Sequence, residues 1–410
     1  MRYALLSFMD KSILIIGTFD TKAEELNFVK DQILARGQKA RTLDAGVLQP
    51  SSETVDISNE RVAAAGGRPL HELVSRRDRG QAVGIMAQGT AKITRELFER
   101  GEISGIISLG GGSGTVIGTR AMRTLPLGIP KLMVSTMASG NVRPYVGTSD
   151  ICMIHSVVDI SGLNRVTKKI LGNAAAAVCG MVEEKEDLSL DGRPLIAVSM
   201  FGVTTPCVTE ARKILEEKGY EVLVFHANGT GGRAMEQLIA EGHIQAVLDI
   251  STTELADELR GGKCSAGPNR LEKAGEMGIP QVVVPGAMDM VNYFPDAIPP
   301  QFRNRLFHVH NPATTLMRTN AEENWKLGEI MGQKLSRSKG PVTVYIPLRG
   351  FSAVDAQGQP FFDPEADRAF VEALKKSLSP GIPVIEKEAH INDPSFARAV
   401  AQALLEFLKK

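Results

Sequence analysis

The sequence predicts an α/β protein made of two doubly wound parallel-sheet domains in tandem, both Rossmann-like. Three observations lead to this prediction. Short apolar runs alternate with helix-length amphipathic segments along the 410 residues. The order of these segments in residues 1–190 is repeated in residues 191–410. Glycine-rich or polar clusters follow most of the runs, at the sheet edge where open parallel sheets bind their ligands.

The apolar runs of the first half are expected to form buried parallel strands, because strands covered on both faces are apolar throughout. They are residues 12–17, 39–44, 82–87, 106–109, 131–134 and 151–154. Helices are expected at 23–36, between 90 and 100, after the glycine-rich stretch near 119–122, and at 164–182. Residues 47–79 lack a clear period, and 63–67 are expected to be loop or lid.

The second half repeats this plan. Its expected strands are residues 195–200, 221–225, 246–250, 279–284, 306–309, 342–346 and 384–385, and a last helix is expected at 394–408. We expect the run at 306–309 to correspond to that at 151–154. The charged, turn-rich stretch 183–194 separates the halves, so we place the domains at 1–190 and 191–410.

Composition excludes several function classes. The 47 basic and 47 acidic residues balance, which argues against binding driven by charge to nucleic acid or a membrane surface. The four cysteines have no Cys-x-x-Cys spacing, which favours free thiols in a reducing compartment. No signal peptide and no membrane-spanning apolar run is recognisable. The expected location is the cytoplasm.

The strongest candidate for a ligand site is a glycine-rich loop after the run at 106–109. It consists of Gly110, Gly111, Gly112, Ser113, Gly114 and Thr115. A buried strand that leads through glycines into a helix is a common phosphate site, since the backbone can approach closely and unpaired amides point at the anion. The loop lacks the Gly-Lys-Ser/Thr of a Walker A motif and fits Gly-x-Gly-x-x-Gly poorly. The alternative is a tight turn that needs glycine only for packing.

Two further loops should leave the same sheet edge. Asp20, Thr21 and Lys22 follow the first strand. Lys22 could meet a phosphate and Asp20 could hold a metal through water, whereas the alternative is a helix cap beside a solvated lysine. The loop after 131–134 adds four candidates, Thr136, Ala138, Ser139 and Gly140.

In the second half, histidines and a carboxylate follow expected strands. We take His226, Asp289 and His308 as catalytic candidates, because such groups gathered from several strand ends can form a metal site or an acid–base pair. The alternative is that each is a hydrogen-bonded structural residue. Arg270 and Arg318 are candidate clamps for a carboxylate or phosphate. The sequence does not identify metal ligands.

Several segments spread along the chain resemble the Tm-one-like ATP-binding domain family, an uncharacterised family that includes a plant inhibitor of tomato mosaic virus replication. They include Gly17-Thr-Phe-Asp-Thr-Lys22, Gly110-Gly-Gly-Ser-Gly-Thr115, Ser135-Thr-Met-Ala-Ser-Gly140, Phe225-His-Ala-Asn-Gly-Thr-Gly-Gly232 and Asp249-Ile-Ser-Thr-Thr-Glu254. The resemblance implies Mg-ATP bound by the first domain, and self-association. Some relatives are fused to a barrel similar to phosphoenolpyruvate-using enzymes, so chemistry that needs such a barrel would require a separate partner here.

The expected function is therefore that of an Mg-ATP-binding enzyme of small-molecule metabolism. ATP would lie on the loop that begins at Gly110, and an oxygenated or carboxylated substrate would be held by the second domain. The alternative is a nucleotide-regulated binding module without turnover. An NAD-type oxidoreductase is disfavoured, since the fingerprint after the first strand is poor.

Overall fold

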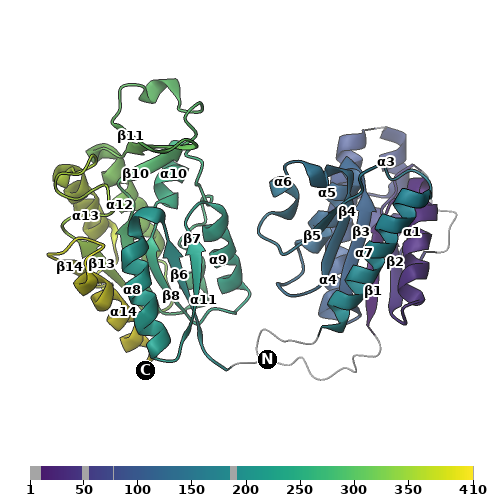
Figure 1. The fold of residues 1–410 in the computed structure, drawn as a ribbon, viewed down its shortest axis with the longest axis horizontal. Helices are drawn as coiled ribbons and strands as arrows, with labels where there is room; N and C mark the ends of the chain where they lie inside the picture. Colours follow the sequence, from purple (N-terminus) through teal and green to yellow (C-terminus); the bar gives the residue numbers. More distant parts are fainter. Residues whose placement is uncertain (1–10, 49–54, 77, 185–191, 410) are drawn as a thin grey trace. The chain divides into compact units, whose positions relative to one another are not determined.

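The computed structural model describes residues 11–48, 55–76, 78–184 and 192–409 (Figure 1). The chain divides into two compact units, unit 1 (Met1–Leu190) and unit 2 (Asp191–Lys410). Each unit is built on a parallel sheet with helices on both faces, which confirms the predicted α/β fold class. None of the helices in the described part of the chain has the length and apolar character needed to cross a bilayer.

Unit 1 contains a five-stranded parallel sheet with the order β2-β1-β3-β4-β5. Its strands are β1 (Ser12–Gly17), β2 (Lys39–Asp44), β3 (Ile103–Gly110), β4 (Lys131–Ser135) and β5 (Cys152–His155). Its helices are α1 (Phe19–Leu34), α2 (Asn59–Ala65), α3 (Leu70–Arg76), α4 (Arg79–Glu99), α5 (Gly112–Met122), η2 (Thr136–Ser139), α6 (Arg143–Val146) and α7 (Arg165–Glu183). Helices α1 and α7 cover one face, and α2, α4 and α5 cover the other.

Two predictions in unit 1 are wrong. The run 82–87 was expected to be a strand, but it lies inside α4, which begins after Asp78 accepts a hydrogen bond from the Gln81 amide. Buried side chains recur along α4 at helical spacing, from Ala82 through Met86 to Ile93, so the apolar run is one face of a helix. Residues 63–67 were expected to be loop or lid, but most of them belong to α2.

Unit 2 repeats the arrangement with a six-stranded sheet, β14-β13-β9-β8-β6-β7. The strands are β6 (Leu195–Met200), β7 (Glu221–His226), β8 (Ala246–Ser251), β9 (Gln281–Gly286), β13 (Val342–Pro347) and β14 (Val384–Lys387). The helices are η3 (Gly202–Thr204), α8 (Thr205–Glu217), α9 (Thr230–Ala240), α10 (Glu254–Arg260), α11 (Lys273–Met277), η4 (Pro300–Phe302), α12 (Ala321–Leu335), α13 (Pro364–Ser377) and α14 (Pro394–Leu408). Helices α8 and α14 pack on one face, and α9, α12 and α13 on the other.

The expected strand at 306–309 is the main correction in unit 2. It forms β11 (Phe307–Asn311), which pairs antiparallel with β12 (Thr314–Arg318) in a separate three-stranded sheet completed by β10 (Met290–Tyr293). In the six-stranded sheet the neighbour of β9 is β13, which therefore occupies the place that β5 has beside β4 in unit 1. In the sequence, the strands of the small sheet lie between β9 and β13, so the repeat is interrupted there.

Candidate functional site

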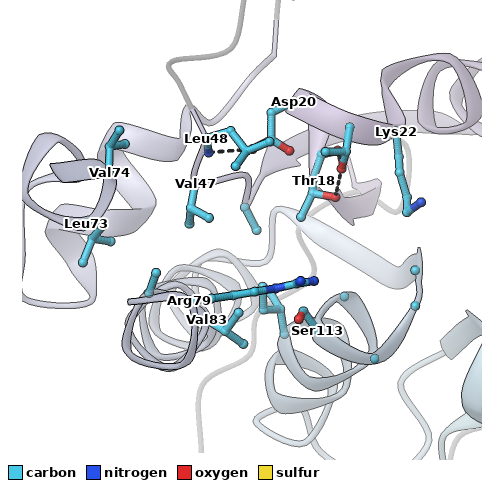
Figure 2. A pocket seen from close by; sticks show the side chains of 18 of the residues that line it. Thr18, Asp20, Lys22, Val47, Leu48, Leu73, Val74, Arg79, Val83 and Ser113 are labelled. Atoms are coloured by element: carbon cyan, nitrogen blue, oxygen red, sulfur yellow. Dashed lines mark hydrogen bonds between the residues drawn. The ribbon is translucent and has the colours of Figure 1, made fainter. Parts of the chain in front are cut away.

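A cavity of about 780 Å³ lies at the carboxyl end of the unit 1 sheet (Figure 2). Strand β1 stands between β2 and β3, so the chain leaves β1 toward one side of the sheet and later leaves β3 toward the other. The loops that follow β1 and β3 diverge at this switch point, and ligands of doubly wound sheets bind in the resulting crevice. Both loops line the cavity, and its volume lies within the range of small-molecule sites.

The glycine loop forms the floor of the cavity. Helix α5 begins at Gly112, and the preceding Gly111 provides no side-chain cap, so the first amides of the helix have no partner within it and no cap from Gly111. A Cβ on Gly112 would have no atom within 4 Å, whereas one on Gly110 would lie 2.9 Å from the Gly114 Cα. A Cβ on Gly118, one turn further, would lie 2.3 Å from Ser108 Oγ. The loop thus contains glycines required for packing and one that faces open space.

Ser113 and Thr115 have different roles. Ser113 lines the cavity and is partly exposed. Thr115 is fully buried, and its hydroxyl bonds to the Gly111 carbonyl at 2.8 Å and to Ser135 Oγ at 2.6 Å. Thr115 was included in the candidate ligand loop, but its hydroxyl is engaged within the chain. It fixes the start of α5 against the end of β4.

The segment after β1 forms a second side, and Asp20, Thr21 and Lys22, which belong to the first turn of α1 rather than to a loop, all line the cavity. Asp20 Oδ2 accepts a hydrogen bond of 2.9 Å from the Leu48 amide, which ties this segment to the loop after β2. Lys22 departs from helical conformation within α1 (φ −139°, ψ 27°), and its amino group donates to the Ile160 carbonyl. The two loops predicted from the sequence therefore do meet at one cavity.

The third predicted loop lies beside this site rather than in it. Thr136, Ala138 and Ser139 form η2, and Gly140 ends it. None of the four is among the residues that line the cavity. Thr136 Oγ1 would be 3.8 Å from a Cβ on Gly111, so η2 borders the back of the glycine loop.

The third side of the cavity was not predicted, because its residues lie in the stretch 47–79, which had no clear period, and in the run 82–87, which was wrongly expected to be a strand. Leu73 and Val74 of α3, together with Val83 of α4, form an apolar wall. Arg79, at the first turn of α4, extends across the cavity toward Ser113 (Figure 2). Among the described residues it forms no ion pair. The sequence feature that could have indicated this wall is the apolar pair at 73–74, followed by an Asp-Arg pair at 78–79 that is typical of a helix start.

Three carboxylates also border the cavity, Asp20, Asp78 and Asp159. Each accepts a hydrogen bond from a backbone amide, at 2.9 Å from Leu48, 3.0 Å from Gln81 and 2.9 Å from Ile160 respectively. In the described part of the chain, no three His, Cys, Asp or Glu side chains are grouped so that they could hold a metal ion.

The catalytic candidates of unit 2 have separate surroundings. His226, at the end of β7, is exposed and sets its ring edge against Phe201, with centroids 5.4 Å apart; partial burial lowers its pKa. His308 was expected on the parallel sheet, but it lies on β11 of the small antiparallel sheet, against the ring of Phe361 at 6.2 Å.

Asp289 differs from both histidines, because it is fully buried. One oxygen accepts from Ser352 Oγ at 2.8 Å, and burial raises its pKa to about 6 despite the nearby Arg318. None of the interactions described here joins Asp289 to either histidine. The structure therefore does not bring the three residues together in a shared set of contacts.

Arg270 binds carboxylates of its own unit. Its guanidinium is fully buried and forms a two-pronged pair with Asp249 at 2.6 and 2.7 Å, while Nε donates to Glu254 at 2.6 Å. The other oxygen of Glu254 accepts from the amides of Gly229 and Gly232 at 2.7 and 3.1 Å. The glycine loop before α9 is thus filled by a carboxylate of the chain itself.

Arg318 is likewise engaged within unit 2. It donates to Asp367 at 2.7 Å and to the Phe361 carbonyl at 2.7 Å. Because the guanidinium is nearly buried, these contacts leave it no open side toward a ligand. The prediction of an external clamp is not supported for either arginine.

These features define a class, namely a doubly wound α/β protein whose first sheet opens at its switch point onto a cavity with a glycine loop, two cations and an apolar wall. The chain belongs to the UPF0261 family: residues 11–187 match "Uncharacterised protein family (UPF0261) N-terminal domain" and residues 193–408 match the corresponding C-terminal domain.

A UPF0261 protein of Clostridium tetani is 49% identical over 98% of this chain and 100% of its own length. The tomato protein called "ToMV resistance protein Tm-1(GCR237)" is 39% identical over 97% of this chain, which spans 56% of that protein. These matches confirm the resemblance inferred from the sequence. Among solved structures, a UDP-N-acetylglucosamine 2-epimerase of Rickettsia bellii aligns over 97% of this chain and 96% of its own, with 11% identity and a TM-score of 0.22, too low for any inference.

Proposed function

We propose that unit 1 binds Mg-ATP in the cavity between the loops after β1 and β3. The supporting observation is the uncapped start of α5 at Gly112, which faces open space within a cavity of about 780 Å³. The amides of a helix start, in a loop that lets a ligand approach the backbone, stabilise a phosphate. Lys22 and Arg79, on opposite sides of the loop, add positive charge, and the wall of Leu73, Val74 and Val83 suits a base ring.

The residues present fit a magnesium ion only as part of a nucleotide complex. Mg²⁺ keeps several waters and is commonly held by one or two carboxylates together with substrate phosphates. Asp20 is the side chain that would hold it, since it borders the cavity in the first turn of α1. When bound, the ion would neutralise phosphate charge. Asp20 would then exchange its bond with the Leu48 amide for the ion.

We propose further that the protein uses ATP as an enzyme of small-molecule metabolism, with the substrate held by unit 2. His226 and His308 support this part, because both are accessible imidazoles. Each imidazole packs edge-on against an aromatic ring, His226 against Phe201 and His308 against Phe361. A small oxygenated or carboxylated molecule would suit such groups. In this proposal Asp289 is the buried acid of the substrate site.

The alternative function is a nucleotide-regulated binding module without turnover. It is favoured by one observation: the described residues that line the cavity include no histidine, the side chain most often used as a general acid or base. Self-association, and a separate barrel partner similar to phosphoenolpyruvate-using enzymes, are proposals that rest on the family alone.

Isothermal titration calorimetry of the full chain with ATP and magnesium tests the nucleotide proposal. Gly112→Val should abolish binding, because the branched side chain enters the space above the helix start, while the fold is kept. Gly172→Val is the matched control, since Gly172 is a helical glycine of α7 whose Cβ also meets no atom within 4 Å. Unchanged affinity in Gly112→Val would move the site elsewhere. ADP release in the presence of a metabolite panel would separate the enzyme from the binding module.

A further inference from the structure

A strained turn follows β5 at the border of the cavity. The Val158 amide donates to the Ser156 carbonyl at 2.7 Å, which makes a three-residue γ-turn around Val157. Val157 has a φ of 63°, a region that β-branched residues rarely adopt, and γ-turns of this hand are rare. Its side chain is 65% exposed, so no burial offsets the strain. Neighbouring residues of the same unit must therefore hold this turn in place.

The hold comes from helix α1. The Lys22 amino group donates to the Ile160 carbonyl, and Glu25 Oε1 accepts from the Gly162 amide at 2.6 Å. Ile160 inserts its side chain into the core beneath α1 and α7. Lys22 departs from helical conformation in the first turn of α1 while it makes this contact. We call residues 159–162 the strapped segment.

Lys22 also lines the cavity, as does Asp159 at the start of the strapped segment. Its amino group therefore lies where a phosphate could reach it. An ammonium group bonds more strongly to a phosphate than to a neutral carbonyl, because both partners are charged. A phosphate in the cavity would also repel the Asp159 carboxylate unless a metal ion lay between them.

We propose that a nucleotide phosphate and the Ile160 carbonyl compete for Lys22, so that nucleotide binding releases the strapped segment and relaxes the turn at Val157. The inference rests on the proposed function of the cavity and adds a conformational response to it. Val157 and Val158, both exposed, would change their presentation at the surface when the nucleotide binds. Nucleotide binding in the cavity would thereby change the exposed surface of unit 1 at these two residues.

Hydrogen–deuterium exchange of the full chain tests the competition. Mg-ATP should accelerate exchange of the amides in residues 158–162 about tenfold, since a hydrogen bond to a charged group corresponds to a factor of about ten to one hundred. Adenosine, which has no phosphate, should leave them unchanged. Lys22→Ala should show the fast exchange without ligand and no further response. Lys168→Ala, an exposed lysine of α7, is the matched control and should behave as the unaltered chain.

Val157→Gly gives an independent check, because glycine adopts a positive φ without strain. Exchange of residues 158–162 without ligand should become slower, and the response to ATP smaller. ATP that binds by calorimetry but leaves exchange unchanged, or slows it, would overturn the coupling while the nucleotide site stands. Failure of ATP to bind would overturn both proposals. Slow exchange in Lys22→Ala would show that the lysine does not hold the segment.

Discussion

The two units each place a glycine-rich loop before a helix, but only one of these loops is open. In unit 1 the first amides of α5 face a cavity, and Gly111 offers them no cap. In unit 2 the amides of Gly229 and Gly232 are taken by Glu254, whose second oxygen is held by the buried Arg270. The same local pattern opens onto a cavity in unit 1 and is closed by an internal contact in unit 2. What decides is whether the fold supplies its own carboxylate.

The largest expected effect comes from removing the cation behind the closed loop. Arg270→Ala leaves the carboxylates of Asp249 and Glu254 buried without compensation, which should destabilise unit 2 by about 3–5 kcal/mol. Urea unfolding followed by fluorescence of Trp325, the single tryptophan of the chain, reports on unit 2. Arg212→Ala, which removes an exposed pair with Glu216, should change stability by less than about 0.5 kcal/mol. Equal effects of both variants would contradict the internal role of Arg270.

The second prediction contrasts the pH dependence of the units. Burial raises the pKa of Asp257 to about 7 and that of Asp289 to about 6, from an ordinary value of 3.8. Between pH 4 and these values the folded chain retains protons that the unfolded chain has lost. Stability of unit 2 should therefore fall as pH rises from 4 to 7, by up to about 1.4 kcal/mol per pH unit for each group. His226, with a lowered pKa, opposes this below pH 6.5.

Unit 1 should show the opposite sign at lower pH. A hydrogen bond from Arg41 is the main cause of the lowered pKa of Glu102, so its contribution is present above pH 4.5 and is lost only as pH falls below that value. Exchange rates of core amides, measured in both units below pH 4.5, at pH 5 and at pH 7, check the comparison. If core amides of unit 2 became better protected at the higher pH, after correction for intrinsic rates, the assignment of buried protons would be wrong.

A third variant makes the open loop resemble the closed one. Gly112→Asp places a carboxylate at the first turn of α5, where a Cβ meets no atom within 4 Å. The charge favours the helix start by about 0.3–1 kcal/mol but repels a phosphate, so stability should rise slightly while ATP affinity falls at least about tenfold. Gly112→Ala is the control and should bind nearly normally. Calorimetry and thermal unfolding check both, and equal ATP affinity in the two variants would rule out phosphate at this loop.

The smallest expected effect concerns Arg79. It extends over the cavity but is exposed, so Arg79→Ala should weaken ATP about three- to tenfold, and adenosine hardly at all, because only ATP presents the anion. Arg76 is an exposed residue at the end of α3, and the control variant Arg76→Ala should bind both ligands normally. At high salt, where charge is screened, the ATP affinities of Arg79→Ala and Arg76→Ala should differ less than they do at low salt. Equal losses for ATP and adenosine would return Arg79 to a packing role.

The sequence predicted the parallel sheets well because their strands are short apolar runs that end in glycine or polar clusters. It failed at 82–87, where six apolar residues fit a strand or a helix face equally, and only the later positions such as Ile93 reveal the helical period. The apolar wall at Leu73 was missed for the same reason, since its helix is too short to show a period. The floor of the cavity was predicted because a buried strand that leads through glycines into a helix is a recognisable local pattern, although the same pattern before α9 is closed by Glu254.

What the sequence could not reveal is which charges meet. Arg270 and Glu254 are 16 residues apart, and nothing local to either indicates that they share a buried contact. Arg270 and Arg318 were therefore predicted to be clamps for a ligand. Likewise, His308 lies within an expected strand, but the pairing of that strand with β12 rather than with the large sheet is a property of the whole unit. Contacts between distant segments require the fold.

The unequal space around the glycines of the first loop has a consequence for natural variation among relatives. Gly110 and Gly118 have no room for a side chain, so any lineage that keeps the fold must keep them. Gly112 has room, and only a ligand would forbid a larger residue there. If the nucleotide proposal holds, a relative in which Gly112 is replaced while Gly110 and Gly118 persist is expected to keep the fold and to have lost nucleotide binding. The residue at position 112 in each relative would then show on which branches of a family tree ligand binding was lost.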